Sequence, residues 1–252
     1  MDRANTKKVI SLFSGAGGMD IGFRDAGFEI AVALEKDPSC CETLRTNSPK
    51  LKVIEGDINH ITTSQILDVA KLEPLEAALV IGGPPCQSFS LAGKRMGLND
   101  ERGKLILEFA RVVKESLPTA FVMENVKGMV NWSNGEAIKA ILREFEEPIK
   151  YRDKNYHYSV SYQVINGSKF GLPQHRERLF IVGNRLNKTF KFPSPTYGGS
   201  EDINQKSLFG ESLKPYQTVW GSIGDLPKAD PPSEVATRIS KTIKERIEKH
   251  GY

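Results

Sequence analysis

Short apolar runs alternate along this chain with longer amphipathic segments. The apolar runs predict strands at residues 9–13, 29–34, 52–54, 77–81, 120–123, 159–165 and 178–182. The amphipathic segments between them predict helices at residues 19–26, 38–46, 64–71, 104–116 and 134–145. Strand and helix in alternation are typical of βαβ units, so we expect an α/β fold with a mostly parallel sheet and helices on both faces.

The candidate chemistry gathers at one edge of this expected sheet. The carboxyl ends of parallel strands meet at the same edge, and ligands of open α/β sheets bind there. Five residues of chemical interest lie at or just past the end of an expected strand: Gly15, Glu35, Asp57, Cys86 and Glu124. A random scatter would not place five candidates together, so the pattern predicts a single site at this edge.

The character of the chain changes after residue 183. Residues 184–232 are rich in Pro, Gly, Ser and Lys, which predicts surface loop with a short helix at 219–226. Residues 233–250 predict a charged helix with an apolar stripe of Val235, Ile239, Ile243 and Ile247. The stripe has to pack on the body of the chain or on a partner. We expect a catalytic domain at residues 1–183 and a loop-rich extension with a C-terminal helix at 184–252.

Composition and charge narrow the class of protein. The 252 residues carry a net charge of +4, which permits nucleic-acid binding without requiring it, because a basic groove can be local. Three cysteines without regular spacing argue against a disulfide framework and against a metal site. The polar N-terminus and the lack of a long apolar stretch predict a soluble, cytoplasmic protein with no membrane association.

The first two signals of chemistry indicate an adenosine-bearing cofactor. The glycine-rich turn FSGAGG at 13–18 lets a ligand approach the backbone, although its spacing is not that of the dinucleotide motif. Glu35 ends the second expected strand and can accept hydrogen bonds from both hydroxyls of a ribose. Asp57 ends the third and can accept from an adenine amino group. The alternative is that both acids are ordinary charges at strand ends.

A thiol follows the fourth expected strand. The sequence GGPPCQ at 82–87 places Cys86 in a tight loop, where a side chain is presented for chemistry. The alternative is a buried cysteine that acts as a small hydrophobe. Two further signals favour chemistry: ENV at 124–126, after the fifth expected strand, and QHRER at 174–178, before the last.

These motifs, in this order, resemble the DNA (cytosine-5) methyltransferases, which have a Rossmann-like fold and use S-adenosylmethionine. The resemblance spans about residues 9–183. The catalytic residues that it implies are Cys86, Glu124, Arg176, Arg178, Pro85 and Asn125. The cofactor-binding residues that it implies are Phe13, Gly15, Ala16, Gly17, Gly18, Glu35, Lys36, Asp57, Ile58, Pro85 and Leu105. No metal is implied.

The chemistry of cytosine methylation is consistent with this assignment. C5 of cytosine is a weak nucleophile until a thiolate adds at C6 and converts the ring into an enamine. Cys86 would supply the thiolate, and Glu124 would hydrogen-bond N3 to stabilise the charge that develops on the ring. Arg176 and Arg178 would hold O2 of the base and orient Glu124; the alternative for both is phosphate contact or a structural ion pair. The sequence does not reveal the base that removes the C5 proton.

The target cytosine lies inside a duplex and has to be rotated out to reach such a pocket. Residues 88–102 resemble the mobile loop that closes over the flipped base in this family, with glycines that permit movement and cations that suit phosphates. The alternative is a solvated basic loop with no gating role. The DNA-binding residues that the resemblance implies are Gln87, Ser88, Ser90, Lys94, Arg95 and Arg102.

The resemblance also indicates what this chain lacks. Family members continue into a target-recognition region and a C-terminal segment that closes the cofactor pocket, and neither is recognisable here. We therefore expect the N-terminal subunit of a two-chain restriction–modification methyltransferase; the alternative is a truncated or decayed product. Two other functions stay open, namely an RNA (tRNA) cytosine-5 methyltransferase and a non-catalytic cofactor-binding subunit.

Overall fold

The computed structural model describes residues 7–85, 101–199, 213–226 and 233–250. The chain divides into two compact units, one of residues 1–167 with 176–195 and the other of residues 168–175 with 196–252. The first unit contains the sheet and the candidate site. Residues 168–175 come just before the last strand of the large sheet in sequence, but they belong to the second unit with residues 196–252.

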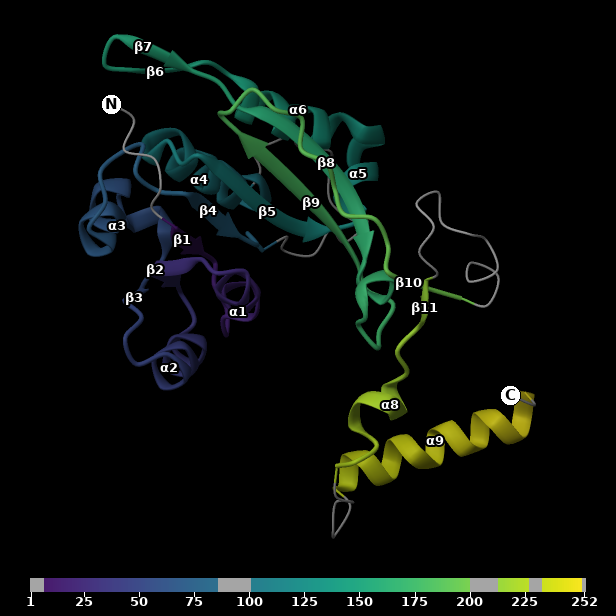
Figure 1. The fold of residues 1–252 in the computed structure, drawn as a ribbon. Helices are drawn as coiled ribbons and strands as arrows, with labels where there is room; N and C mark the ends of the chain where they lie inside the picture. Colours follow the sequence, from purple (N-terminus) through teal and green to yellow (C-terminus); the bar gives the residue numbers. More distant parts are fainter. Residues whose placement is uncertain (1–6, 86–100, 200–212, 227–232, 251–252) are drawn as a thin grey trace. The chain divides into compact units, whose positions relative to one another are not determined.

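The first unit is built on a seven-stranded sheet (Figure 1). Its strands are β1 Lys8–Leu12, β2 Glu29–Glu35, β3 Val53–Glu55, β4 Leu79–Gly82, β5 Ala120–Val126, β8 Ser159–Asn166 and β9 Glu177–Asn184. Their order is β3-β2-β1-β4-β5-β9-β8. Pairing is parallel from β3 to β5, and β9 pairs antiparallel with both β5 and β8. The predicted α/β fold with a mostly parallel sheet is confirmed.

The strand order sets the position of the candidate site. The chain proceeds outward from β1 to β3 on one side and returns to β4 on the other side of β1. The loops that follow β1 and β4 therefore leave from neighbouring strands and run in opposite directions. In open α/β sheets, ligands bind at such a switch point. The glycine-rich turn follows β1, and the loop that leads to Cys86 follows β4.

Helices cover both faces of the sheet. They are α1 Gly18–Asp25, α2 Pro38–Asn47, α3 Thr63–Ala70, α4 Glu101–Ser116, α5 Gly128–Asn131 and α6 Glu136–Glu146. Helices α3, α4 and α6 bury apolar side chains in one large core with Ile10 and Leu12 of β1. On the opposite face, Val9 of β1 packs in a smaller core with Met19 and Phe23 of α1. The alternation of side chains along a strand divides β1 between the two cores in this way.

Aromatic packing fixes the antiparallel side of the sheet. The rings of Phe121 and Phe145 stack with centroids 4.4 Å apart, and Phe109 packs edge-on against both. Gly183 of β9 lies opposite Phe121 of β5. A Cβ atom at Gly183 would collide with the Phe121 ring, so glycine is required there.

Short connecting turns shape the edge of the sheet next to the site. Asp37 caps α2 by accepting a hydrogen bond from the Cys40 amide at 3.0 Å, and Pro38 occupies the first turn. The 3₁₀ turn η1 Ile58–His60 follows β3 and has Asp57 as its N-cap. Two further 3₁₀ turns are η2 Trp132–Gly135 and η3 Gly167–Phe170.

Several elements differ from the sequence-based expectation. Strand β5 continues to Val126, three residues past its expected end, because β9 pairs with it along that whole length. The hairpin of β6 Ile149–Tyr151 and β7 Lys154–Tyr156 was not expected, and neither were the two-residue strands β10 Tyr197–Gly198 and β11 Lys214–Pro215. These strands are too short to leave a period of alternating polarity in the sequence.

Among the described residues beyond 215, the second unit contains two helices. Helix α8 spans Val219–Ile223 and is three residues shorter than expected, and α9 spans Glu234–His250. The apolar stripe of α9 is open to solvent in the described residues, since Val235, Ile239 and Ile243 are each about half exposed. In the part of the chain that the structure describes, the helices are all too short or too polar to cross a membrane.

Candidate active site

The glycine-rich turn between β1 and α1 has a backbone that few residues adopt. Gly15 and Gly17 have φ angles of 53° and 87°, and Phe13 also lies in the left-handed region at 52°. The Gly17 amide donates to the Ser14 carbonyl at 3.0 Å and closes the turn. A Cβ on Gly17 would come within 2.8 Å of a Leu44 methyl, so this glycine serves both conformation and packing.

Glu35 connects this turn to the end of β2. Its Oε2 accepts a hydrogen bond from the Gly15 amide at 2.7 Å. Its Oε1 accepts from the amides of Lys36 at 2.7 Å and Asp37 at 2.9 Å. A carboxylate has about four lone-pair sites, so these three bonds orient Glu35 and leave it able to accept from a ligand hydroxyl.

Asp57 carries a second fixed carboxylate one strand away. Its Oδ1 accepts from the Asn59 amide at 3.0 Å and from Asn59 Nδ2 at 2.6 Å. Its Oδ2 pairs with Lys36 Nζ at 2.7 Å. The hydrogen bond from Lys36 is the main reason that the pKa of Asp57 falls to about 2, and the Asn59 amide adds to it. Asp57 is therefore ionised at neutral pH.

The two carboxylates line a cavity of about 1050 Å³ at the carboxyl ends of β1 to β4. Seven of the expected cofactor-binding residues line it: Phe13, Glu35, Lys36, Asp57, Ile58, Pro85 and Leu105. Four expected residues are not among its lining, because the glycine-rich turn meets the cavity through Phe13: Gly15, Ala16, Gly17 and Gly18. Eight further residues line it and were not expected from the sequence: Leu34, Asp37, Pro38, Gly56, Asn59, His60, Gly83 and Lys104.

The donor set of this cavity fits an adenosyl group. The carboxylates of Glu35 and Asp57 can accept hydrogen bonds from ribose hydroxyls and from an adenine amino group. The apolar side chains that line the cavity are those of Phe13, Leu34 and Leu105. The volume is at the upper end of the range for small-molecule sites. The eight unexpected lining residues lie next to the expected ones in sequence. Most of them would have been found by including the sequence neighbours of Glu35 and Asp57.

The acid motif lies beside the segment that leads to Cys86. Asn125 is buried, and its Nδ2 donates to the Pro84 carbonyl at 3.1 Å. Its Oδ1 accepts from the Val126 amide at 2.8 Å, which fixes the side chain. A Cβ on Gly83 would come within 3.0 Å of Glu124 Oε2, so Glu124 lies directly against the same segment.

An ion pair orients Glu124. Arg178 Nε lies 2.8 Å from Glu124 Oε1, and about a quarter of each side chain is exposed. The antiparallel register of β5 and β9 brings the two residues together. Arg176 was expected to share this role, but its side chain is exposed, and its backbone is what bonds Asn166 and Gly167. Arg178 is the arginine that contacts Glu124.

Several of the expected site residues lie outside the described part of the chain. They are the nucleophile and five of the DNA-contact residues, namely Cys86, Gln87, Ser88, Ser90, Lys94 and Arg95. Arg102 belongs to the first turn of α4, and its side chain is not described. Pro85, the last described residue before Cys86, lines the cavity. The roles of these seven residues stay predictions.

Asp20 is a buried acid beneath the glycine-rich turn that the sequence analysis did not single out. Ser11 Oγ donates to its Oδ1 at 2.6 Å, whereas Oδ2 has no hydrogen-bond partner among the described residues. Burial raises the pKa of Asp20, and the Ser11 hydroxyl and Arg24 oppose that rise more weakly. A raised folded-state pKa means that folding of the charged form carries a penalty.

We expect Asp20→Asn to stabilise the protein by about 1 kcal/mol at neutral pH and to have little effect near pH 3, below the unfolded-state pKa of the acid. At low pH Asp20 is protonated in both the folded and the unfolded state. As pH rises through its raised folded-state pKa, the free energy of unfolding of the wild type falls. That of Asp20→Asn does not fall for this reason, because the amide stays neutral. Thermal melts of both proteins between about pH 3 and 8 measure the difference. Asp25→Asn, on the exposed face of the same helix, is the matched control. A destabilised Asp20→Asn protein at neutral pH would contradict this account.

Comparison with known proteins identifies the class to which this fold and site belong. The family model of C-5 cytosine-specific DNA methylases matches residues 7–251. The chain is 65% identical to Type II methyltransferase M.AquIA of Picosynechococcus over 98% of its own length and 99% of that protein. It is 45% identical to Type II methyltransferase M.FnuDI of Fusobacterium nucleatum, over 75% of this chain and 51% of that protein.

Solved structures agree with this class. A DNA modification methyltransferase encoded within an E. coli prophage superposes with a TM-score of 0.66 at 25% identity, over 88% of this chain and 56% of that one. DNMT2 of Spodoptera frugiperda shares the fold, with a TM-score of 0.54 at 24% identity over 74% of this chain and 52% of that one.

The chain belongs to the C-5 cytosine-specific DNA methylase family. It is a DNA cytosine-5 methyltransferase of the restriction–modification type that uses S-adenosylmethionine as methyl donor. It spans nearly all of M.AquIA but about half of M.FnuDI and of the prophage enzyme.

Proposed function

We propose that this chain methylates C5 of cytosine in duplex DNA through a covalent adduct between Cys86 and C6 of a base rotated out of the helix. One observation carries this proposal: the buried Asn125 side chain hydrogen-bonds Pro84, two residues before Cys86. Pro85, the residue between them, lines the cavity that holds Glu35 and Asp57. The acid motif, the cavity and the described segment that leads to Cys86 therefore share one edge of the sheet, which supports the proposal.

Each step assigns a role to a residue of this chain. The Cys86 thiolate forms a bond to C6 of the base, while a proton shared between the Glu124 carboxyl and N3 neutralises the charge that develops on the ring; Arg178 orients Glu124 for this role. When bound, S-adenosylmethionine would supply the methyl group: the bond between its sulfonium and the methyl would break as C5 forms its bond to the methyl, and S-adenosylhomocysteine would leave as a neutral thioether. A base then removes the C5 proton, the C6–S bond breaks and the thiolate leaves. Glu35 and Asp57 hold the adenosyl group throughout.

We further propose that a second polypeptide completes the enzyme and supplies the target-recognition region. M.FnuDI and the prophage enzyme are about twice as long as the part that this chain matches, whereas M.AquIA is matched over 99% of its length. The C-terminal unit also presents apolar side chains to solvent. Trp220 of α8 is 79% exposed, and Val235, Ile239 and Ile243 of the α9 stripe are about half exposed. Burial of such side chains is the main source of affinity at stable interfaces.

Co-expression with the adjacent reading frame of the source genome tests this second proposal. We expect the two products to co-purify and together to methylate duplex DNA at a defined sequence, with tRNA as the negative substrate. The double variant Ile239→Lys, Ile243→Lys is expected to weaken the complex by about 30-fold or more, because it places charges in the apolar stripe.

The matched control is Glu245→Lys, which changes charge on α9 outside the stripe and should leave the complex intact. Full, sequence-specific methylation of DNA by this chain alone would refute the need for a second polypeptide. That outcome would not bear on the catalytic role of Cys86, because it shows which polypeptide recognises the DNA sequence and not how the methyl group is transferred.

A further inference from the structure

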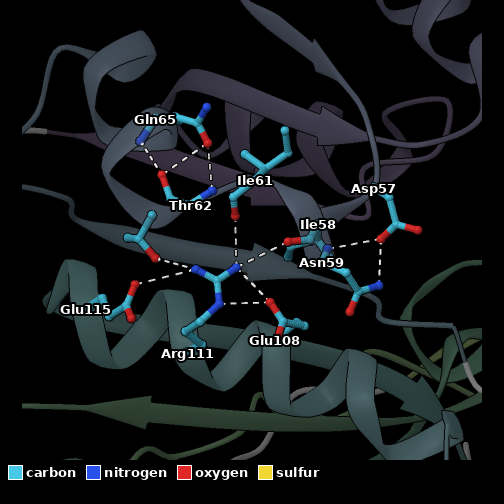
Figure 2. A network of polar contacts seen from close by, with 10 residues as sticks. Asp57, Ile58, Asn59, Ile61, Thr62, Gln65, Glu108, Arg111 and Glu115 are labelled. Atoms are coloured by element: carbon cyan, nitrogen blue, oxygen red, sulfur yellow. Dashed lines mark hydrogen bonds and ion pairs between the residues drawn. The ribbon is translucent and has the colours of Figure 1, made fainter.

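Arg111 joins α4 to the turn that follows β3. Figure 2 shows its guanidinium extending from α4 toward the backbone of η1, with acidic side chains of the same helix beside it. None of the motifs in the sequence includes Arg111. About a quarter of its side chain is exposed, so most of it lies between these two elements.

One side of the guanidinium satisfies groups of the turn. Arg111 Nη2 donates to the carbonyl of Ile58 at 3.2 Å and to the carbonyl of Ile61 at 3.0 Å. Its Nη1 donates to Thr63 Oγ1 at 2.9 Å. The Ile58 carbonyl also accepts from the Ile61 amide at 3.3 Å within the turn, so Arg111 adds a second donor there and supplies a donor to the Ile61 carbonyl from another element.

The other side of the guanidinium is held by its own helix. Glu108 Oε2 accepts from Nε at 2.8 Å and lies 2.7 Å from Nη2. Glu115 contributes a longer contact at 3.4 Å to Nη1. The planar fork of arginine can make all of these bonds at once, and a lysine ammonium, with three donors on one atom, cannot.

The two elements that Arg111 joins form two walls of the cavity. The turn contributes Ile58, Asn59 and its N-cap Asp57, and α4 contributes Lys104 and Leu105. The distance between these walls determines whether a planar base fits between them while an amino group reaches Asp57. Arg111 does not line the cavity, so its influence is exerted through the turn.

We infer that Arg111 is a positioning residue that fixes the Asp57–Ile61 turn against α4 and thereby sets the recognition of the cofactor's adenine. This inference rests on the proposed adenosyl site. It assigns Arg111 a role in affinity and base discrimination, and none in the methyl-transfer step.

Direct binding measurements test this role. Calorimetry with S-adenosylhomocysteine and with its inosine analogue, which lacks the adenine amino group, gives an affinity and a discrimination ratio for each protein. For Arg111→Met we expect at least about tenfold weaker binding of the adenosyl ligand and a smaller preference for it over the inosyl ligand. Arg111→Lys should recover only part of the affinity and part of the preference, because lysine keeps the positive charge but lacks the planar guanidinium. In turnover, KM for S-adenosylmethionine should rise while kcat stays close to that of the wild type.

Lys114→Met is the matched control, since Lys114 lies on the same helix, is similarly exposed and pairs with Glu144 and Glu147 of another segment. It removes ion pairs from α4 without touching the turn, so its discrimination ratio should equal that of the wild type. An Arg111→Met protein with a lowered Tm but an unchanged ratio would overturn the inference and leave Arg111 a structural residue. A wild type that binds neither ligand would instead refute the adenosyl site itself, and the inference with it.

Discussion

Cys86→Ser is expected to abolish methyl transfer, by about 10⁴-fold or more, while S-adenosylmethionine binding stays intact. A serine hydroxyl at this position has no base within the proposed machinery to make it an alkoxide, so the bond to C6 does not form. Cofactor binding is retained because Glu35 and Asp57 belong to other segments of the cavity wall. Incorporation of a labelled methyl group into DNA and calorimetry with S-adenosylhomocysteine measure the two properties separately.

The matched control for this change is Cys40→Ser. Cys40 lies on α2 and is partly exposed, so the same replacement there tests the chemistry of cysteine away from the proposed nucleophile. The Cys40→Ser protein should methylate at the wild-type rate. Unchanged methylation by Cys86→Ser would refute the nucleophile role.

Glu124→Gln is expected to have the second largest effect, a loss of about 10²- to 10⁴-fold in turnover at unchanged cofactor affinity. The amide removes both the acid that serves N3 of the base and the 2.8 Å ion pair with Arg178. Arg178→Ala should lower turnover as well, since it leaves Glu124 without the partner that orients it. The double variant should be little worse than Glu124→Gln, because residues that act as a unit are non-additive.

A second ion pair near the same strands supplies the control. Glu177 of β9 pairs with Lys127 at 2.8 Å, and about half of each side chain is exposed. Glu177→Gln breaks a pair of similar length, but exposed pairs contribute little to stability. Its turnover should match the wild type. Additive losses in the Glu124 and Arg178 cycle would show that the two side chains act independently.

The sequence indicated which strands and which strand-end acids would lie at one edge of the sheet, because these positions depend only on where each strand ends. Each parallel strand was recognisable from its apolar run, and Glu35 and Asp57 follow from where β2 and β3 end. The course of the backbone brings residues at the ends of parallel strands to one edge of the sheet, so their position can be predicted without knowing any side-chain contact. Leu105, which lines the cavity at the start of α4, was expected from the family resemblance alone and not from the strand ends.

The pairings between side chains could not be read in the same way. That Arg178 rather than Arg176 contacts Glu124 depends on the register of β9 against β5, and an antiparallel register is set by tertiary packing such as that of Gly183 on Phe121. The contact of Asn125 with Pro84 joins segments 41 residues apart. The Arg111 contacts likewise span 48 to 53 residues.

The Lys36–Asp57 pair is a further case in which the structure adds to the sequence. Lys36 was expected only as a cofactor-binding residue, and its ammonium lies 2.7 Å from the carboxylate expected to receive the adenine amino group. The low pKa of Asp57 follows from this contact first of all. Local sequence could not indicate it, because Lys36 follows β2 and Asp57 follows β3, so the two residues are far apart along the chain.

The most direct test of the account uses duplex DNA in which 5-fluorocytosine replaces cytosine in a random sequence. After methyl transfer, C5 of this base has no proton to lose, so the C6–S bond cannot break and the protein stays attached to DNA. We predict a covalent complex that requires S-adenosylmethionine and whose DNA-bearing peptide, identified by mass spectrometry after proteolysis, contains Cys86. Methylation of ordinary cytosine by the same preparation with no trapped complex, or a complex formed at another residue, would contradict the account.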